Sequence, residues 1–192
     1  SNAYGQSTTV TEMHCGQFIN GGLPTCRRTC LRFNTESIGS LSTVTDVKLG
    51  LSWSVDGSDT DFDIQILKHD WSSQYPLSSE NRETYYDNVL TASQDDSIWR
   101  NTANLPNQHV IGYSGSLSNS WVNKSGYTYY SLLSSRDASS IEPTGNEYIK
   151  FNTAEVANES RRPRLSITYT TAGALLKVNM NGQMQNLSGG FN

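Results

Sequence analysis

Apolar and polar residues alternate with a period of two in several short stretches of the chain. The clearest stretch is 164–169, where Leu, Ile and Tyr alternate with Arg, Ser and Thr. Because successive side chains of a strand point to opposite faces, this pattern predicts a strand with one buried face. Pro163 precedes the stretch and fits only at the start of a strand, since proline has no N–H to donate to a sheet.

The same pattern recurs along the chain, with turn residues between the stretches. It is clear at 29–34, 47–55, 62–66, 127–133 and 147–151, and weaker at 7–12 and 108–113. Together these stretches give about eight strands, which predicts an all-β fold, a jelly-roll β-sandwich of two antiparallel sheets. The turn between the second and third clear stretches predicts a hairpin. Apolar residues on both faces of 127–133 predict that one face of that strand is only partly covered.

Residues 70–105 form a long polar segment with little alternation and one short helical pattern at 85–90. Segments of this length inside a compact domain are more often functional than idle. We therefore expect this segment to contribute to any binding site.

The chain changes character after Gly173. Asn181-Gly182 lies between two extended runs, which is the strongest short signal for a hairpin turn. Because a lone hairpin is only marginally stable, residues 173–192 are predicted to be a linker or the start of a following β-hairpin module in a larger protein. Residues 1–3 look like the remnant of a cleaved purification tag, which leaves 4–172 as the jelly-roll binding or structural module.

Several motifs resemble the DNRLRE domain, also called the disaggregatase-related repeat. The matching residues are Leu31-Arg32-Phe33-Asn34, Trp121-Val122-Asn123 with Gly126, and the stretches 151–158 and 161–171. DNRLRE domains are β-sandwich modules of secreted and surface proteins, and some are classed among carbohydrate-binding modules. The resemblance implies a binding or structural module and names no ligand.

The composition narrows the classes of partner. The chain has 192 residues, enough for one domain with a sizeable core. A net charge of −4 and a pI near 5.3 provide no basic field for a phosphate backbone, so we expect no nucleic-acid partner. No apolar run approaches the roughly 20 residues of a membrane-spanning helix, so we expect no membrane insertion.

Three cysteines lie close together near the start of the chain. Cys15, Cys26 and Cys30 are odd in number, so they cannot all pair with one another. One disulfide from Cys15 to Cys26 or Cys30, three thiols, and a metal site that includes His14 all stay open.

Catalytic motifs are missing from the sequence. There is no Gly-x-Ser-x-Gly elbow, no phosphate-binding glycine loop and no His-Glu-x-x-His pair. The three histidines, His14, His69 and His109, are scattered, and no pair of carboxylates stands out for glycoside cleavage. We therefore expect the chain not to be an enzyme.

An acidic turn is the best candidate for a structural calcium ion. Its aspartates are Asp56, Asp59, Asp61 and Asp63. Calcium takes oxygen ligands from carboxylates that are closely spaced in turns. The spacing differs from the helix-loop-helix calcium pattern, and a solvated turn without a metal is the simpler interpretation.

Aromatic residues in and beside the long polar segment are the candidates for sugar binding, because aromatic faces stack on pyranose rings. The candidate rings are Trp71, Tyr75, Tyr85, Tyr86 and Trp99. An acidic polysaccharide would need cations in the groove, for which Lys68, Arg82 and Arg100 are the candidates.

These features favour a non-catalytic carbohydrate-binding module of a larger secreted or surface protein. Its expected partners are a polysaccharide or glycan and other modules of the same protein, and assembly as an oligomer stays open. The alternative hypothesis is a structural or adhesive spacer in a phage virion or a cell-surface fibre. A polysaccharide-degrading enzyme domain is the third. All three hypotheses imply an extracellular, cell-surface or virion location.

Overall fold

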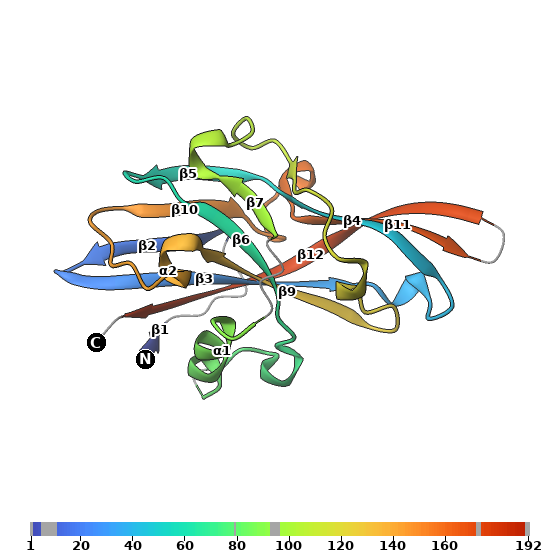
Figure 1. Ribbon diagram of the computed structural model, residues 1–192, viewed down its shortest axis with the longest axis horizontal. Helices are drawn as coiled ribbons and strands as arrows, with labels where there is room; N and C mark the ends of the chain where they lie inside the picture. The colour runs from blue at the N-terminus through green and yellow to red at the C-terminus, as the bar shows by residue number, and fades with distance from the viewer. Residues whose placement is uncertain (1, 5–10, 79, 93–96, 172–173, 191–192) are drawn as a thin grey trace.

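A computed structural model describes residues 2–4, 11–78, 80–92, 97–171 and 174–190 of the chain (Figure 1). The strands are β1 (Asn2–Tyr4), β2 (Glu12–Asn20), β3 (Leu23–Asn34), β4 (Thr43–Leu51), β5 (Trp53–Ser58), β6 (Asp63–Lys68), β7 (Ile98–Asn101), β8 (Gly112–Tyr113), β9 (Tyr127–Ser134), β10 (Glu147–Asn152), β11 (Arg164–Thr171) and β12 (Ala174–Gly190). Two short α-helices, α1 (Arg82–Val89) and α2 (Ser135–Ala138), and several 3-10 turns join them. All strand pairs in this part of the chain are antiparallel.

Strand β3 is where the two layers of the sandwich meet. One edge of β3 pairs with β12, whereas the other edge pairs with β2 through residues 23–27 and with β9 through residues 29–34. From β2 the sheet continues to β10 and β5, and from β9 it continues to β6 and β7. Since β2 and β9 leave the same edge of β3, the strands beyond them diverge into two layers (Figure 1).

The core lies between these layers and confirms the predicted all-β sandwich. The buried apolar side chains include Met13, Leu31, Phe33, Val47, Leu49, Leu51, Ile64, Ile66, Trp99, Trp121, Ile149, Phe151, Leu165 and Ile167. Most of them occupy alternate positions of the strands predicted from the sequence. The period-two pattern therefore identified parts of β3, β4, β5, β6, β9, β10 and β11 with their inward faces, whereas β7 and nearly all of β2 lie outside the predicted stretches.

The predicted hairpin through the acidic turn is wrong. Strand β5 pairs with β10, whereas β6 pairs with β7 and β9. The link between them carries the chain from one layer to the other. It is held by Asp59 N donating to Asn146 O and by Phe62 N donating to the Thr102 hydroxyl.

The predicted turn at Asn181-Gly182 is also wrong. Strand β12 runs straight through this dipeptide, pairing with β11 before it and with β3 after it. A Cβ at Gly182 would overlap the ring of Phe33, so the glycine provides space for a core ring rather than a turn. Residues 174–190 are thus part of the same sheet as the rest of the chain, and Asn2–Tyr4 pairs with their far end.

A second buried group lies where α1 covers one face of β3 and β9. We call it the helix-covered cluster, and its members are Cys26, Cys30, Leu67, Trp71, Leu77, Tyr85, Tyr86, Val89 and Leu133. The helical pattern predicted at 85–90 falls in α1 and at its C-terminal end. The long polar segment therefore supplies a lid over the sheet, and most of its rings point inward.

Candidate functional site

Four of the predicted sugar-binding rings are buried in the structure. Trp71 is 1% exposed and Tyr85 0% exposed in the helix-covered cluster, where Tyr86 is also buried. Trp99 lies in the main core, and its indole N–H donates to Gly112 O at 2.8 Å. These four rings are satisfied packing residues, so the prediction that they form an exposed platform is corrected.

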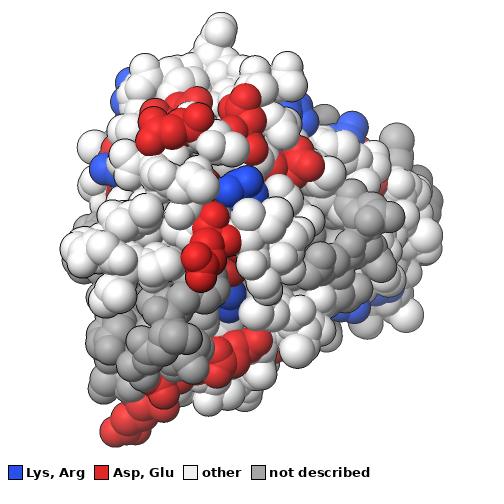
Figure 2. All heavy atoms as spheres, turned by 60° about the vertical axis from the view of Figure 1, so that its left-hand side comes forward, with Lys and Arg blue, Asp and Glu red and all other residues white. Residues whose placement is uncertain are grey.

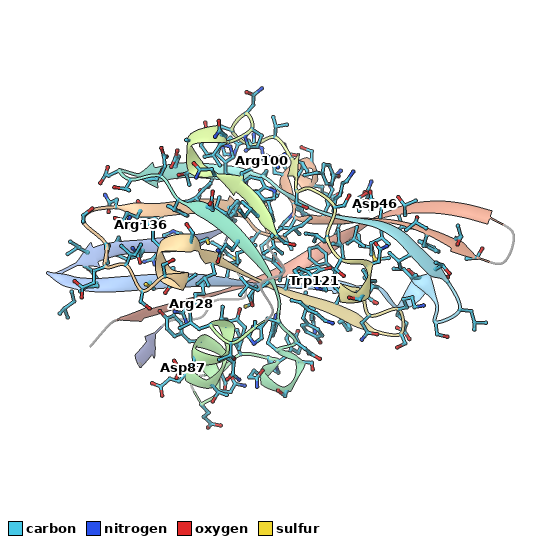
Figure 3. All side chains as sticks on the ribbon, in the orientation of Figure 1. Arg28, Asp46, Asp87, Arg100, Trp121 and Arg136 are labelled. Atoms are coloured by element: carbon cyan, nitrogen blue, oxygen red, sulfur yellow. The ribbon has the colours of Figure 1, made fainter. Side chains whose placement is uncertain are left out.

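The predicted cations do not gather in one groove. Arg100 donates to the carbonyl oxygens of Trp99 at 2.7 Å and Tyr113 at 2.6 Å. Figure 3 shows this residue of β7 apart from Trp121. The side chain of Arg82 lies outside the described residues. Lys68 and Tyr75 are exposed, and the surface around them holds a pocket.

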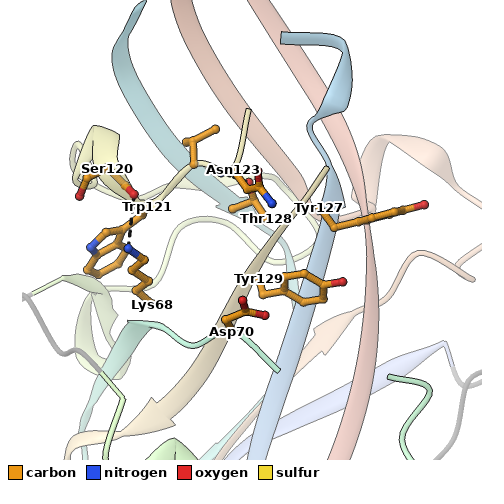
Figure 4. A pocket seen from close by; sticks show the side chains of 9 residues that line it. Lys68, Asp70, Ser120, Trp121, Asn123, Tyr127, Thr128 and Tyr129 are labelled. Carbon is orange, nitrogen blue, oxygen red and sulfur yellow. Dashed lines mark hydrogen bonds between the residues drawn. The ribbon is translucent and has the colours of Figure 1, made fainter. Parts of the chain in front are cut away.

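This pocket has a volume of about 240 Å³ and lies at the edge of β9 (Figure 4). It is lined by Lys68, Asp70, Ser120, Trp121, Val122, Asn123, Tyr127, Thr128 and Tyr129. Figure 4 shows Lys68 and Trp121 on one side, Tyr127 and Tyr129 on the other, and Asp70 between them. We call it the β9 pocket.

The pocket exists because the N-terminal end of β9 extends beyond the point where β6 ends. Strand β6 pairs with residues 130–134 of β9 and stops at Lys68, so residues 127–129 have no β6 neighbour. The loop 120–123 faces this stretch and is fixed to it, because the Thr128 hydroxyl accepts from Asn123 N at 2.9 Å. The hydroxyl of Thr35, the residue that follows β3, lies 2.8 Å from the same Thr128 hydroxyl. The walls of the pocket are therefore tied together by hydrogen bonds.

Three polar side chains at the pocket are oriented by local bonds. Asp70 Oδ1 accepts from Ser72 N at 3.0 Å, which fixes the carboxylate in a turn. Asn123 Oδ1 accepts from Ser125 N at 3.1 Å, so the amide nitrogen of Asn123 is not used in this bond. The Lys68 ammonium lies 3.4 Å from Ser120 O, a long contact that leaves donor capacity for a ligand.

A row of partly exposed rings continues from the pocket. We call Tyr75, Tyr127 and Tyr129 the tyrosine strip; Tyr75 is 40% exposed and Tyr127 38%. Arg32 joins them, because its guanidinium carbon lies 3.6 Å from the centre of the Tyr75 ring and 4.3 Å from that of Tyr127. Its Nη2 also donates to the Tyr75 hydroxyl at 2.9 Å. Stacking on one guanidinium preorganises the exposed rings.

Tyr129 joins the strip to the interior. Its ring meets that of the buried Trp71 edge to face, with centroids 5.0 Å apart. Partial burial raises the pKa of Tyr129, and the positive charge of Arg32 offsets part of that rise. The phenol is therefore a neutral donor and acceptor at physiological pH.

Of the residues proposed from the sequence, Lys68 and Tyr75 belong to this surface, whereas Asp70, Asn123, Tyr127 and Tyr129 were missed. A signal for the two β9 tyrosines was present, since apolar residues on both faces of 127–133 predicted a partly covered face. Asn123 stands in one of the motifs that resemble the DNRLRE domain. No sequence signal marked Asp70, which reaches the pocket only because β6 ends two residues before it.

The four aspartates of the acidic turn do not converge on one point. Asp56 accepts from Ser58, Asp59 from Asn146 N, Asp61 from Thr102 and Asp63 from Asn101. Among the described residues, no group of three His, Cys, Asp or Glu side chains could hold a metal ion. The predicted calcium site is corrected to four separate hydrogen-bonded carboxylates.

The three cysteines are buried thiols in the structure, and the disulfide left open by the sequence is not formed. Cys15 lies in the main core, whereas Cys26 and Cys30 lie in the helix-covered cluster. Burial raises the pKa of the Cys15 and Cys26 thiols, so they stay protonated and unreactive.

Charged side chains at the surface are mainly acidic on one end of the molecule. Figure 2 shows Asp and Glu gathered on the end that lies to the left in Figure 1.

No described helix has both the length and the apolar character that crossing a bilayer would take. Neither a known protein family, nor a curated protein, nor a solved structure matches the chain.

Proposed function

We propose that this chain is a non-catalytic carbohydrate-binding module of a larger secreted or surface protein. The observation that carries the proposal is the β9 pocket with the tyrosine strip beside it. Sugars present hydroxyl groups that donate and accept hydrogen bonds, and C–H faces that pack on aromatic rings. A pocket with Lys68, Asp70 and Asn123 beside three tyrosines suits both parts of such a ligand.

The composition of the pocket argues for binding rather than cleavage. Glycoside hydrolases canonically place two carboxyl groups on either side of the scissile bond. Among the described residues that line the β9 pocket, Asp70 is the one that carries a carboxylate. Its turn with Ser72 positions it as a hydrogen-bond acceptor, and a catalytic partner for it is missing from that lining.

The resemblance to DNRLRE domains adds further support. Two of its motifs, at 31–34 and 121–126, contain Trp121 and Asn123, which line the pocket, and Arg32, which stacks on rings of the strip. A glycan and neighbouring modules of the same protein are the partners that this function implies. Its location would be extracellular, at a cell surface or in a virion.

Affinity electrophoresis in gels that contain polysaccharides tests the proposal. The informative change is Tyr127→Thr, which removes an exposed ring and keeps a residue that favours strands. We expect at least one polysaccharide to retard the wild-type chain, and the variant to bind it roughly tenfold more weakly, since one stacked ring contributes about 1–2 kcal/mol.

The matched control is Tyr148→Thr, which removes a partly exposed tyrosine of β10 that packs beside His14. This change should leave the retardation intact. If a broad set of neutral and acidic polysaccharides fails to retard the wild-type chain, the binding proposal falls and the structural or adhesive spacer becomes the better hypothesis.

A further inference from the structure

We infer that the β9 pocket is selective for neutral sugars and holds two adjacent hydroxyl groups of one sugar ring between Lys68 and Asp70. This inference rests on the proposed function and specifies the class of ligand. A neutral ligand differs from the acidic polysaccharide for which Lys68, Arg82 and Arg100 were the candidate cations in the sequence.

The charge balance of the pocket is the first reason. Its lining contains one cation, Lys68, and one anion, Asp70, among the described residues. A uronate carboxylate drawn to Lys68 would also approach Asp70, and two like charges at close range repel. The net charge of −4 on the whole chain adds to the penalty for a polyanion. A ligand without charge avoids both costs.

The hydrogen-bonding capacity of the pocket is the second reason. Asp70 Oδ1 accepts one hydrogen bond from Ser72 N, so the carboxylate, which lines the pocket, keeps further acceptor capacity. Lys68 offers only donors, and the amide nitrogen of Asn123 offers two more. A hydroxyl can donate to Asp70 while accepting from Lys68 or Asn123. A carboxylate can only accept, so it would leave Asp70 without a donor.

The size and position of the pocket complete the argument. A volume of about 240 Å³ is suited to one sugar ring rather than a length of chain. The tyrosine strip begins at the wall of the pocket, where Tyr127 and Tyr129 stand two residues apart on β9 (Figure 4). The next sugar of a chain would therefore pass from the pocket onto exposed rings. Polar capture of one ring and stacking of the next describe a chain-end or side-branch site.

Asp70→Asn is the test substitution, because asparagine keeps the turn with Ser72 and removes the charge. The matched control is Asp56→Asn, since Asp56 Oδ1 makes the same kind of turn with Ser58 N at 3.1 Å outside the pocket. The probes are gels that contain a neutral polysaccharide (a glucan, xylan, mannan or galactan) or a polyuronate (alginate or pectate). Lys68→Met, with Lys150→Met as its control on β10, tests the other side of the pocket.

We expect a gel that contains a neutral polysaccharide to retard the wild-type chain. We expect gels that contain a polyuronate not to retard it. Asp70→Asn and Lys68→Met should each weaken binding to the neutral polysaccharide about 10-fold or more, because each removes a hydrogen bond to a charged group. The two control variants should bind within about twofold of wild type.

Three results would overturn the inference. Retardation by a polyuronate that Asp70→Asn strengthens would keep the binding function and reverse the ligand class. The second result is a neutral polysaccharide that retards the wild-type chain, Asp70→Asn and Lys68→Met equally. That result would support the binding function and show that the binding site is not the β9 pocket. Failure of every polysaccharide to retard the wild-type chain would remove the function itself, and the inference with it.

Discussion

Two tyrosines pack edge to face against the same indole, yet they belong to different regions of the molecule. Tyr85 and Trp71 have ring centroids 6.0 Å apart with an interplanar angle of 90°, and Tyr129 and Trp71 have centroids 5.0 Å apart at 78°. Tyr85 belongs to α1 and is fully buried, whereas Tyr129 is partly exposed at the β9 pocket. Trp71 thus marks the boundary between a region built for stability and one that is open to a ligand.

The difference lies in what happens to the polar groups on each side. Under α1 the phenol of Tyr85 is 2.6 Å from the Ser131 hydroxyl, which is also 2.9 Å from His69 Nδ1. Burial makes such bonds obligatory, because an unpaired group there costs free energy. Around the pocket, Lys68 and Asp70 are exposed and keep bonding capacity for a ligand. Satisfied polar groups stabilise the fold, and incompletely satisfied ones are available for recognition.

The sharpest way to break the buried region is to remove the partner of Arg28. Arg28, labelled in Figure 3, is 1% exposed. It makes a two-pronged pair with Asp137, at 2.7 and 2.8 Å, and its guanidinium lies over the ring of Tyr86. Asp137→Asn leaves a buried guanidinium without a counter-charge, and we expect it to lower the free energy of unfolding by about 3–5 kcal/mol. Urea denaturation at pH 7 measures this loss.

Glu12→Gln provides the comparison at an exposed pair. Glu12 and Lys150 are 3.6 Å apart and both are partly exposed, so this change should cost less than about 1 kcal/mol. Similar losses for Asp137→Asn and Glu12→Gln would contradict the view that the helix-covered side is maintained by buried polar pairing.

Acid should weaken the same buried region through His69. Burial lowers the pKa of His69 to about 4, against an ordinary value of 6.5, although Asp70 opposes the shift. The unfolded chain therefore takes up a proton below pH 6.5 that the folded chain refuses until about pH 4, so stability falls as the pH falls. Between pH 6.5 and 5 this group should remove about 1.5 kcal/mol.

Urea denaturation at pH 6.5 and pH 5 checks this effect, and both values lie above the range in which most carboxylates titrate. His69→Asn keeps a nitrogen near the position of Nδ1 and cannot be protonated. The variant should lose most of the difference between the two pH values. An unchanged difference would mean that other groups carry the acid sensitivity.

A matched pair of substitutions compares the two tyrosines directly. Tyr85→Phe leaves the Ser131 hydroxyl without its phenol partner inside the protein and should cost about 1–2 kcal/mol. Tyr129→Phe removes a phenol that water can reach, and it should cost less than about 0.5 kcal/mol. Thermal unfolding of the two variants side by side gives the comparison. Equal costs would mean that Trp71 does not divide buried from exposed surface.

Most of the strands could be predicted because half-buried strands leave a period-two signature that depends only on local order. Leu31, Phe33, Ile149 and Phe151 are apolar members of the stretches predicted on this basis, and all four are buried. Pairing between strands is not local. The acidic turn therefore resembled a hairpin even though β5 and β6 pair with different strands, and Gly182 resembled a turn residue even though it makes room for Phe33.

The site was harder to predict, because exposure depends on which segment covers which face. Trp71 and Tyr75 are only four residues apart, yet one is buried under the lid and the other is 40% exposed. The sequence of the segment does not reveal that α1 folds back over β3 and β9. Asp70 was missed for a related reason: it becomes a pocket residue only where β6 stops and β9 continues.

A substitution with a small expected effect on stability sharpens the comparison most. Tyr127→Thr removes a ring that is 38% exposed and stacks on Arg32, so we expect it to cost less than about 1 kcal/mol in thermal unfolding. The same variant should lose most of its polysaccharide binding, because in the proposed site this exposed ring would stack on the sugar. A residue with little effect on folding and a large effect on binding separates recognition from packing. A large loss of stability for Tyr127→Thr would instead place this ring among the supports of the fold.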